Sequence, residues 1–287
     1  MNNFKSSCIT SLRVDAREFF VKRDDLIDPF LAGNKYRKLY TLLQTNPEKY
    51  NRIISYGGTQ SNAMLAIAAM CKNKGWEFIY YTKPQNEVMK NQTIGNFFHA
   101  KSLGMQHVEI AHDNYKEFIS ALRLNLDDKT YVIDQGGADS SAKAGLEVLA
   151  NEIRESGLHV KSLATPSGTG TTALFLALAL PEYKVYTTPC VGDVAYLKEQ
   201  MSSLHVIPEN LVILEPKMKY HFAKPYPEFL EIYKKLLTCG VEFDLLYAPN
   251  MWKTLLEKTD EEILYIHSGG VSGNESMLKR YEKKYKN

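Results

Sequence analysis

The segment VKSLATPSGTGTTALFLALALP, from Val160 to Pro181, decides the fold class. Its first seven residues are typical of a short strand, and a glycine- and threonine-rich loop follows them. The apolar run from Ala173 to Leu180 then predicts a helix that is buried inside the protein. A strand, a tight loop and a buried helix in this order indicate one unit of a parallel sheet.

The rest of the chain alternates strands and helices in the same way. The expected strands are Arg52–Tyr56, Phe78–Thr82, His107–Ala111, Thr130–Asp134, Lys184–Thr188, Asn210–Leu214, Glu242–Tyr247 and Glu262–Ile266. The expected helices include Ser61–Lys72, one that ends at Gly104, and Ser141–Ser156, which stops at Gly157. This pattern predicts an α/β fold with parallel sheets and helices on both faces, in which ligands bind in the loops after strands.

The composition excludes several functional classes. The chain has 287 residues, of which 44% are hydrophobic and 24% charged, as in an ordinary globular protein. A net charge of +2 provides no overall field for nucleic-acid or membrane partners. The longest apolar run is too short to span a bilayer, and the N-terminal residues lack the apolar core of a signal peptide. We therefore expect a cytoplasmic protein.

Cysteine and histidine residues predict no metal site. The four cysteines, Cys8, Cys71, Cys190 and Cys239, are widely scattered, and no CxxC pair is present. This spacing favours reduced thiols over a disulfide framework or a zinc ribbon. The sequence His107-Val108-Glu109 resembles the HxE motif of zinc deaminases, but the cysteine pair that would complete that motif is missing.

Two of the loops that follow expected strands each allow a structural and a functional interpretation. In YGGTQSNAM, Tyr56 to Met64, Ser61 and Asn62 open a helix whose free N–H groups and dipole favour an anion. Alternatively, one of these two residues only caps the helix. In YIHSGGVSGN, Tyr265 to Asn274, the glycines either form a simple turn or allow the backbone and Ser268 to approach a flat ligand.

The loop PSGTGTTAL has the features of a phosphate site. Gly168 and Gly170 permit close approach of the backbone, and three hydroxyl groups lie at the helix start, those of Thr169, Thr171 and Thr172. No GK[ST] follows, so the loop is not a P-loop. It also matches GxGxxA through Ala173, and Asp193 lies at about the distance of a ribose-binding acid. An NAD-dependent oxidoreductase therefore remains an alternative.

The segment LAGNKYRKLY, Leu31 to Tyr40, concentrates positive charge after a hydrophobic stretch. Its basic residues could simply face water on a helix. Alternatively, Lys35 is chemically active, because Arg37 and Lys38 nearby would lower its pKa and make the amine more nucleophilic. Lys38, three residues further along the same helix face, would then crowd Lys35 or contact an anion.

Together, these loops meet the requirements of pyridoxal 5′-phosphate (PLP). This cofactor needs a lysine for its aldehyde, backbone N–H groups for its phosphate and polar partners at the edges of its ring. We expect Lys35 to supply the amine and the loop at Gly168 to hold the phosphate.

Six motifs resemble the D-cysteine desulfhydrase and 1-aminocyclopropane-1-carboxylate (ACC) deaminase family. They are VKRDDL at 21–26, GNKYRKL at 33–39, GGTQSN at 57–62, YVIDQGG at 131–137, SGTGTTA at 167–173 and IHSGG at 266–270. This resemblance covers nearly the whole chain. It implies a PLP enzyme with the two-domain, tryptophan-synthase β-like fold, known as PLP fold type II.

The resemblance also implies roles for individual residues. Lys35 is similar to the lysine that holds the cofactor, and Asn62 to the asparagine that contacts the ring hydroxyl. Ser61 corresponds to an active-site serine and Tyr247 to an active-site tyrosine. Ser268 falls where relatives have a threonine near the pyridine nitrogen. The phosphate loop corresponds to Gly168, Thr169, Gly170, Thr171 and Thr172.

Three positions depart from the family pattern. Ala63 stands where relatives often have histidine, and Ala248 follows Tyr247 where ACC deaminases have glutamate. The segment HFAKP at 221–225 replaces a GYG-type loop, which places Phe222 where a second tyrosine is expected. The departures leave the cofactor better supported than the substrate, and Ala248 favours β-elimination from D-cysteine over opening of the ACC ring.

From the resemblance we expect PLP between a large domain, residues 1–46 and 152–287, and a small domain, residues 47–151. The expected enzyme is a PLP-dependent lyase or deaminase that acts on a small amino acid as a homodimer. The alternatives are ACC deamination, a PLP-binding protein that has lost catalysis, and the NAD-dependent oxidoreductase.

Overall fold

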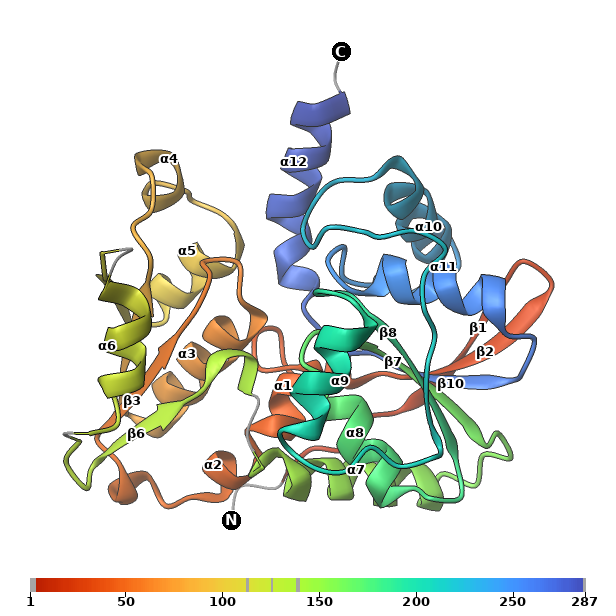
Figure 1. The fold of residues 1–287 in the computed structure, drawn as a ribbon, viewed down its shortest axis with the longest axis horizontal. Coiled ribbons are helices and arrows are strands. Elements are labelled where there is room, and N and C mark those ends of the chain that lie inside the picture. The colour runs from red at the N-terminus through yellow and green to blue at the C-terminus, as the bar shows by residue number, and fades with distance from the viewer. Residues whose placement is uncertain (1–3, 112–113, 125, 138–139, 286–287) are drawn as a thin grey trace.

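The computed structural model consists of two β-sheets surrounded by helices, as Figure 1 shows. The structure describes residues 4–111, 114–124, 126–137 and 140–285. Within these residues, one sheet has four strands and the other has six. The expectation of an α/β fold with parallel sheets is therefore confirmed.

The four-stranded sheet is formed by the N-terminal half of the chain and has the order β5-β4-β3-β6. Its strands are β3 (Arg52–Tyr56), β4 (Glu77–Thr82), β5 (Met105–Glu109) and β6 (Thr130–Ile133). All neighbouring strands in this sheet run parallel, and β3 lies between β4 and β6. The loops that follow their carboxyl ends consequently meet at one edge of the sheet.

The six-stranded sheet has the order β1-β2-β10-β7-β8-β9. Its parallel strands are β2 (Arg17–Lys22), β10 (Ile263–Ile266), β7 (Ser162–Ser167), β8 (Lys184–Pro189) and β9 (Leu211–Ile213). Strand β1 (Ile9–Val14) pairs antiparallel with β2 at the edge. This N-terminal hairpin was not among the strands expected from the sequence.

Helices cover both sheets (Figure 1). Those in the first half are α1 (Gly33–Lys38), α2 (Tyr40–Gln44), α3 (Asn62–Lys74), α4 (Glu87–Lys90), α5 (Gly95–Ser102) and α6 (Tyr115–Ala121). Those in the second half are α7 (Ala142–Glu155), α8 (Thr171–Ala179), α9 (Val194–Ser202), α10 (Pro227–Thr238), α11 (Ala248–Lys258) and α12 (Asn274–Tyr285). Short 3₁₀ turns lie at Asp24–Leu26, Pro47–Lys49, Gln135–Gly137 and Val271–Gly273.

Helices α3 and α8 contribute many residues to the apolar cores beside the four-stranded and the six-stranded sheet, respectively. Every residue from Ala63 to Cys71 in α3 is buried, and so is every residue from Thr171 to Ala177 in α8. Both buried stretches are largely apolar around the whole helix, so these helices pack against other elements on all sides. The prediction of a buried helix after the Gly168 loop is confirmed. Each helix begins directly after a strand and a polar loop, so its N-terminus lies beside that loop.

The expected strand Glu242–Tyr247 is wrong. This segment has no regular secondary structure, although Phe243, Leu245 and Leu246 are buried like strand residues. The Asp244 carboxylate accepts hydrogen bonds from the backbone N–H groups of Leu246 and Tyr247, at 3.0 and 2.6 Å. These bonds curl the chain into the start of α11, because the side chain replaces the partners that a strand would provide.

The N-terminal helices contact elements of both halves. Leu31, Leu39 and Leu42 belong to the apolar core beneath the four-stranded sheet, while α1 and α2 also pack against α7. The division into residues 47–151 and the remainder of the chain stays a prediction. Among the residues that the structure describes, no helix is long and apolar enough to cross a membrane.

Candidate active site

Helix α1 starts directly against the loop that follows β10. Gly33 has a φ of 61°, and a Cβ at this position would overlap the backbone of Ser268 and Gly269. The Asn34 N–H donates to the Ser268 carbonyl oxygen at 3.3 Å. Glycine is therefore required at position 33 by both its backbone conformation and the close approach. Two residues later, the same helix presents Lys35.

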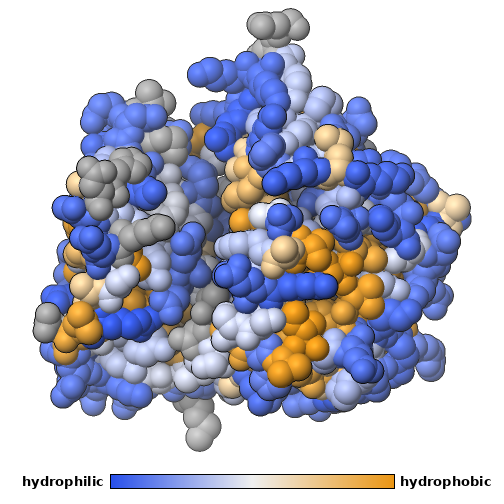
Figure 2. Space-filling view, in the orientation of Figure 1, coloured by the Kyte–Doolittle hydropathy of each residue, from blue (hydrophilic) through white to orange (hydrophobic). Residues whose placement is uncertain are grey.

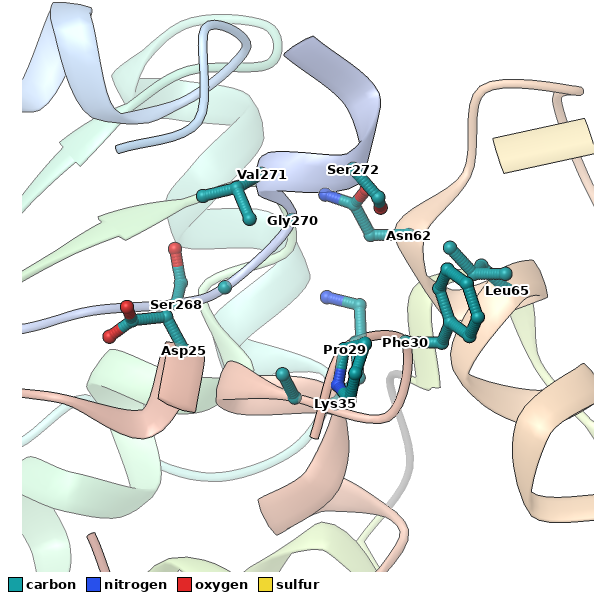
Figure 3. Close-up of a pocket in the computed structure, with 12 residues that line it drawn as sticks. Asp25, Pro29, Phe30, Lys35, Asn62, Leu65, Ser268, Gly270, Val271 and Ser272 are labelled. Atoms are coloured by element: carbon teal, nitrogen blue, oxygen red, sulfur yellow. The ribbon is translucent and has the colours of Figure 1, made fainter. Parts of the chain in front are cut away.

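Lys35 is a partly buried lysine that makes one hydrogen bond to a side chain in the described structure. Its Nζ donates to Asn34 Oδ1 at 3.0 Å. Figure 3 shows the side chain extending from α1 towards the space between Ser268 and Asn62. Burial lowers the pKa of Lys35 to about 8, and the negative charge of Asp244 only partly opposes this shift. The amine is consequently much easier to deprotonate than an exposed lysine.

The sequence suggested that the flanking cations lower the pKa of Lys35. In the structure these cations are not the cause of the shift. Arg37 is fully buried and points away, making bidentate ion pairs with Asp24 and Glu152. Lys22 also pairs with Glu152 at 2.7 Å, so this buried network fixes α1 to β2 and α7. The lowered pKa of Lys35 was predicted correctly, but burial produces it.

Lys38 is the second lysine of the site. Its Nζ donates to the carbonyl oxygen of Gly136 at 3.3 Å. Gly136 in turn lies near Thr169, because a Cβ at Gly136 would be 3.8 Å from the Thr169 methyl carbon. Burial lowers the pKa of Lys38 well below its usual range, and Lys35 lowers it further. An anion bound near Thr169 would relieve this unfavourable burial of positive charge.

The phosphate-type loop lies between β7 and α8. Gly170 has a left-handed conformation, with a φ of 76°, and precedes the first residue of α8. The hydroxyl groups of Thr169 and Thr171 are 2.9 Å apart, and Thr172 Oγ1 accepts a hydrogen bond from Asn34 Nδ2 at 3.3 Å. The first N–H groups of α8 have no partners within the helix, which suits an anion.

On the side of the four-stranded sheet, Ser61 and Asn62 begin α3. Ser61 Oγ accepts a hydrogen bond from the Met64 N–H at 3.2 Å, so the capping alternative is correct for Ser61. Ser61 and Asn62 also line the same cavity as Lys35. Capping and a functional role are therefore compatible here.

Tyr247 closes another side of the cavity. Its ring packs against Phe222 at a centroid distance of 5.0 Å, and burial raises its pKa, so the hydroxyl keeps its proton. A Cβ at Gly168 would lie 3.4 Å from the Tyr247 ring, which shows how closely the loop and the ring approach. Ala248, the next residue, is only 1% exposed. No carboxylate follows Tyr247 at this position.

All eleven residues expected in the site line one cavity of about 520 Å³. These residues are Lys35, Lys38, Ser61, Asn62, Gly168, Thr169, Gly170, Thr171, Thr172, Tyr247 and Ser268. Phe222 lines the cavity as well. The fold thus brings together loops that are more than 200 residues apart in the sequence. The individual roles of these residues stay predictions.

Two alternative sites that the sequence suggested, a ribose-binding acid at Asp193 and a zinc motif at His107, receive no support from the structure. Asp193, the expected ribose-binding acid, caps α9 by accepting a hydrogen bond from the Tyr196 N–H at 2.9 Å. His107 lies on β5, where its Nε2 is 2.8 Å from the hydroxyl of Thr82. Among the described residues, no group of three or more metal-ligating side chains is present.

Sequence reasoning missed two buried polar residues behind the site. Asp244 is the charged neighbour of Lys35, and burial raises the pKa of its carboxyl group to about 6. The sequence did contain a signal for Asp244, because an aspartate shortly before a proline is typical of a residue that caps a helix start. Asn96, on α5, contacts Asn62 and had no comparable signal, because its partners are distant in the sequence.

The comparisons with known proteins agree with this site. The family described as "Pyridoxal-phosphate dependent enzyme" matches residues 6–196. The chain therefore belongs to the family of pyridoxal-phosphate dependent enzymes, and its cofactor is PLP. The resemblance inferred from the six motifs is confirmed.

Two curated relatives extend over most of the chain. A Thermotoga maritima protein named "Putative 1-aminocyclopropane-1-carboxylate deaminase" is 26% identical over 285 residues, which cover 88% of this chain and 89% of the relative. The Arabidopsis thaliana "Bifunctional D-cysteine desulfhydrase/1-aminocyclopropane-1-carboxylate deaminase, mitochondrial" is 26% identical over 292 residues, which cover 89% and 73%.

A solved structure described as an ACC deaminase homologue has a TM-score of 0.75 and 23% identity. The match covers 96% of this chain and 94% of that structure. The fold is therefore that of the type II PLP enzymes, as expected.

The residues of the cavity fit this cofactor. Lys35 supplies a partly buried amine with a lowered pKa, and the start of α8 together with Lys38 offers donors that suit a phosphate. Asn62 and Ser268 provide polar groups on two sides of Lys35. A flat, anionic aldehyde is the ligand that this set of donors suits.

Proposed function

We propose that this enzyme catalyses β-elimination from D-cysteine or a close analogue, releasing pyruvate, ammonia and sulfide. The observation that carries the proposal is the place of the Lys35 amine in the cavity, between Asn62 and Ser268. A pKa lowered to about 8 would let this partly buried amine exchange a proton near neutral pH. The bound cofactor supplies the electron sink that makes an α-proton of an amino acid acidic. Lys35 would take this proton from the substrate Cα.

Other residues would orient the substrate and move a second proton. Ser61, Asn62 and the N-terminus of α3 would hold the substrate carboxylate, because free N–H groups at a helix start favour an anion. The Tyr247 hydroxyl, which keeps its proton, would assist proton movement near the leaving sulfur. Ser268 would offer a neutral hydroxyl to the pyridine nitrogen and leave that nitrogen unprotonated.

The choice of D-cysteine over ACC depends on Ala248. ACC has no α-hydrogen, so opening its ring needs an additional acid or nucleophile. At the position where ACC deaminases have glutamate, this chain has a buried methyl group. D-cysteine has an α-hydrogen and a β-thiol, so Lys35 and Tyr247 suffice.

The test compares purified enzyme with D-cysteine, L-cysteine and ACC at equal concentrations. Pyruvate and sulfide are measured for the two cysteines, and 2-oxobutyrate is measured for ACC. We expect the fastest turnover with D-cysteine and little with ACC. Faster turnover of ACC would refute the proposal. No turnover of any substrate, with PLP still bound, would favour the catalytically degenerate alternative.

We also propose that the chain forms a homodimer in the cytoplasm and that residues 47–151 form the small domain. The dimer is supported by apolar side chains that gather on the half of the molecule carrying the larger sheet, beside α9 (Figure 2). In the segment following α9, Val206 is 79% exposed and Met218 is 53% exposed. Light scattering after gel filtration should give twice the chain mass, and the mass of a single chain would contradict the dimer.

A further inference from the structure

Asn96 is a fully buried asparagine that joins both halves of the site. It is the second residue of α5 and has an exposed fraction of 0%. Its Nδ2 donates to the Gln60 carbonyl oxygen at 3.1 Å and to Asn62 Oδ1 at 2.7 Å. Its Oδ1 accepts a hydrogen bond from Ser272 Oγ at 2.9 Å. Asn96 thus uses both ends of its amide.

These contacts fix which way each amide faces. The Gln60 carbonyl oxygen can only accept, so the nitrogen of Asn96 must face it. The same nitrogen also faces the side chain of Asn62, which must therefore present its oxygen. As a result, the Asn62 Nδ2 group is turned away from Asn96.

The freed Asn62 Nδ2 lies beside Gly270, at the edge of the space that holds Lys35. A Cβ at Gly270 would overlap this nitrogen, so glycine is needed there to admit the amide. Figure 3 shows Asn62 between Ser272 and Lys35. Within the part of the chain that the structure describes, no protein atom accepts a hydrogen bond from Asn62 Nδ2. A donor without an acceptor beside the cavity suits an anionic ring oxygen.

We propose that Asn96 is a positioning residue that holds Asn62 with its N–H group towards the PLP ring oxygen. The proposal depends on the PLP cofactor of the family and is independent of the D-cysteine reaction. Without Asn96, the Asn62 amide could rotate and present its oxygen. Two acceptors would then face each other, and the ring oxygen would have to keep its proton.

The same residue links the two sheets. Ser272 follows β10 of the six-stranded sheet, whereas Asn62 and Asn96 belong to helices beside the four-stranded sheet. A second link across this boundary, from Ser276 Oγ to Gln60 Oε1 at 2.7 Å, does not involve Asn62. This second link provides a matched control for effects on the sheet boundary alone.

The main test is Asn96→Asp in the PLP-loaded protein. The substitution preserves shape but replaces the N–H donor by a carboxylate, so Asn62 would turn its Nδ2 towards the new acceptor. We expect absorbance to move from the visible to the near ultraviolet. PLP should be lost ten to a hundred times faster on dilution, corresponding to one hydrogen bond to a charged group. Circular dichroism melting checks that the fold is retained.

A double-mutant cycle separates positioning from a general structural role. In the Asn62→Ala background, Asn96→Asp should change neither the spectrum nor PLP release any further, because its effect acts through Asn62. Ser276→Ala should leave the spectrum unchanged. Equal effects of Asn96→Asp with and without Asn62 would overturn the proposal.

A milder variant decides the matter if Asn96→Asp does not fold. Ser272→Ala removes the donor to Asn96 Oδ1 and should produce a smaller change in the same direction. An unchanged spectrum and PLP release in the folded variants would overturn the proposal. A failed D-cysteine assay would leave these readouts intact, so the two failures can be distinguished.

Discussion

Gly33 and Ser268 approach so closely that no side chain fits between them. This contact joins the start of α1, which carries Lys35, to the loop after β10, which carries Ser268. The position of the reactive amine therefore depends on a backbone-to-backbone contact between residues that are far apart in the sequence. The same contact holds Lys35 and Ser268 at one corner of the site.

Replacing Gly33 by alanine should disrupt this corner. The added Cβ must displace the Ser268 backbone, and the left-handed conformation adds strain of about 1 kcal/mol or more. We expect a loss of several kcal/mol in the free energy of unfolding, measured in urea, together with loss of bound PLP. Gly157→Ala is the matched control, because Gly157 has a φ of 70° but nothing within 4 Å of the added Cβ. An equal loss of stability and of bound PLP in both variants would show that the contact between Gly33 and Ser268 is not the cause.

Replacing Lys35 by methionine should stabilise the cofactor-free protein. The pKa of Lys35 falls from 10.5 in the unfolded chain to about 8 in the folded protein. The unfolded state therefore binds more protons between these values, and stability rises with pH in this window. Below pH 8 the buried charge costs roughly 3 kcal/mol at most, at about 1.36 kcal/mol per pKa unit.

Urea unfolding at pH 7 and pH 10 measures this difference. Lys35→Met should have a larger free energy of unfolding than the wild type at pH 7, and this difference in stability should be smaller at pH 10. Lys72→Met, at an exposed position of α3, serves as the control. A difference in stability that does not depend on pH would contradict the lowered pKa of Lys35.

Replacing Tyr247 by phenylalanine should affect turnover but not cofactor binding. The hydroxyl is removed while the packing against Phe222 is preserved. Positioned proton transfer typically contributes about 10²–10⁴-fold, so D-cysteine turnover should fall by this factor with the PLP absorbance unchanged. Tyr183→Phe, which removes a hydroxyl outside the cavity, should retain activity. Full activity of Tyr247→Phe would exclude the proposed role.

Valine at Gly168 or Gly170 should weaken PLP binding by a factor of ten or more, which corresponds to about 1.4 kcal/mol. At Gly168 the side chain would fill the gap next to Tyr247. At Gly170 it would crowd Met201 and Leu197 of α9 and strain the backbone, so this variant should also unfold at lower urea. PLP titration and urea unfolding measure the two effects. Unchanged PLP affinity in both variants would contradict the phosphate assignment.

Much of this architecture could be predicted from local sequence patterns. The apolar run after Gly170 indicated a buried helix, because burial on all sides leaves a local signature. The three polar loops each followed a strand, and parallel strands place such loops at one edge of a sheet. Lys35 could be singled out because its glycine and its basic neighbours are adjacent in the sequence.

Features that depend on distant partners could not be predicted. Arg37 was expected to influence Lys35, but its charge is neutralised by Asp24 and by Glu152, 115 residues away. Asn96 escaped notice for the same reason, because its partners Asn62 and Ser272 are distant in the sequence.

The strand expected at residues 242–247 fails for a local reason. The Asp244 side chain accepts hydrogen bonds from the N–H groups of Leu246 and Tyr247 and bends the chain into a turn. Such local side-chain bonds compete with strand formation.

The most direct test of the account is to locate the lysine that carries PLP. The purified protein is reduced with borohydride and digested, and the modified peptide is sequenced by mass spectrometry. We predict a pyridoxyl group on Lys35 and loss of the visible absorbance band. A modification on Lys38, Lys22 or any other lysine, or no modification at all, would contradict the central claim.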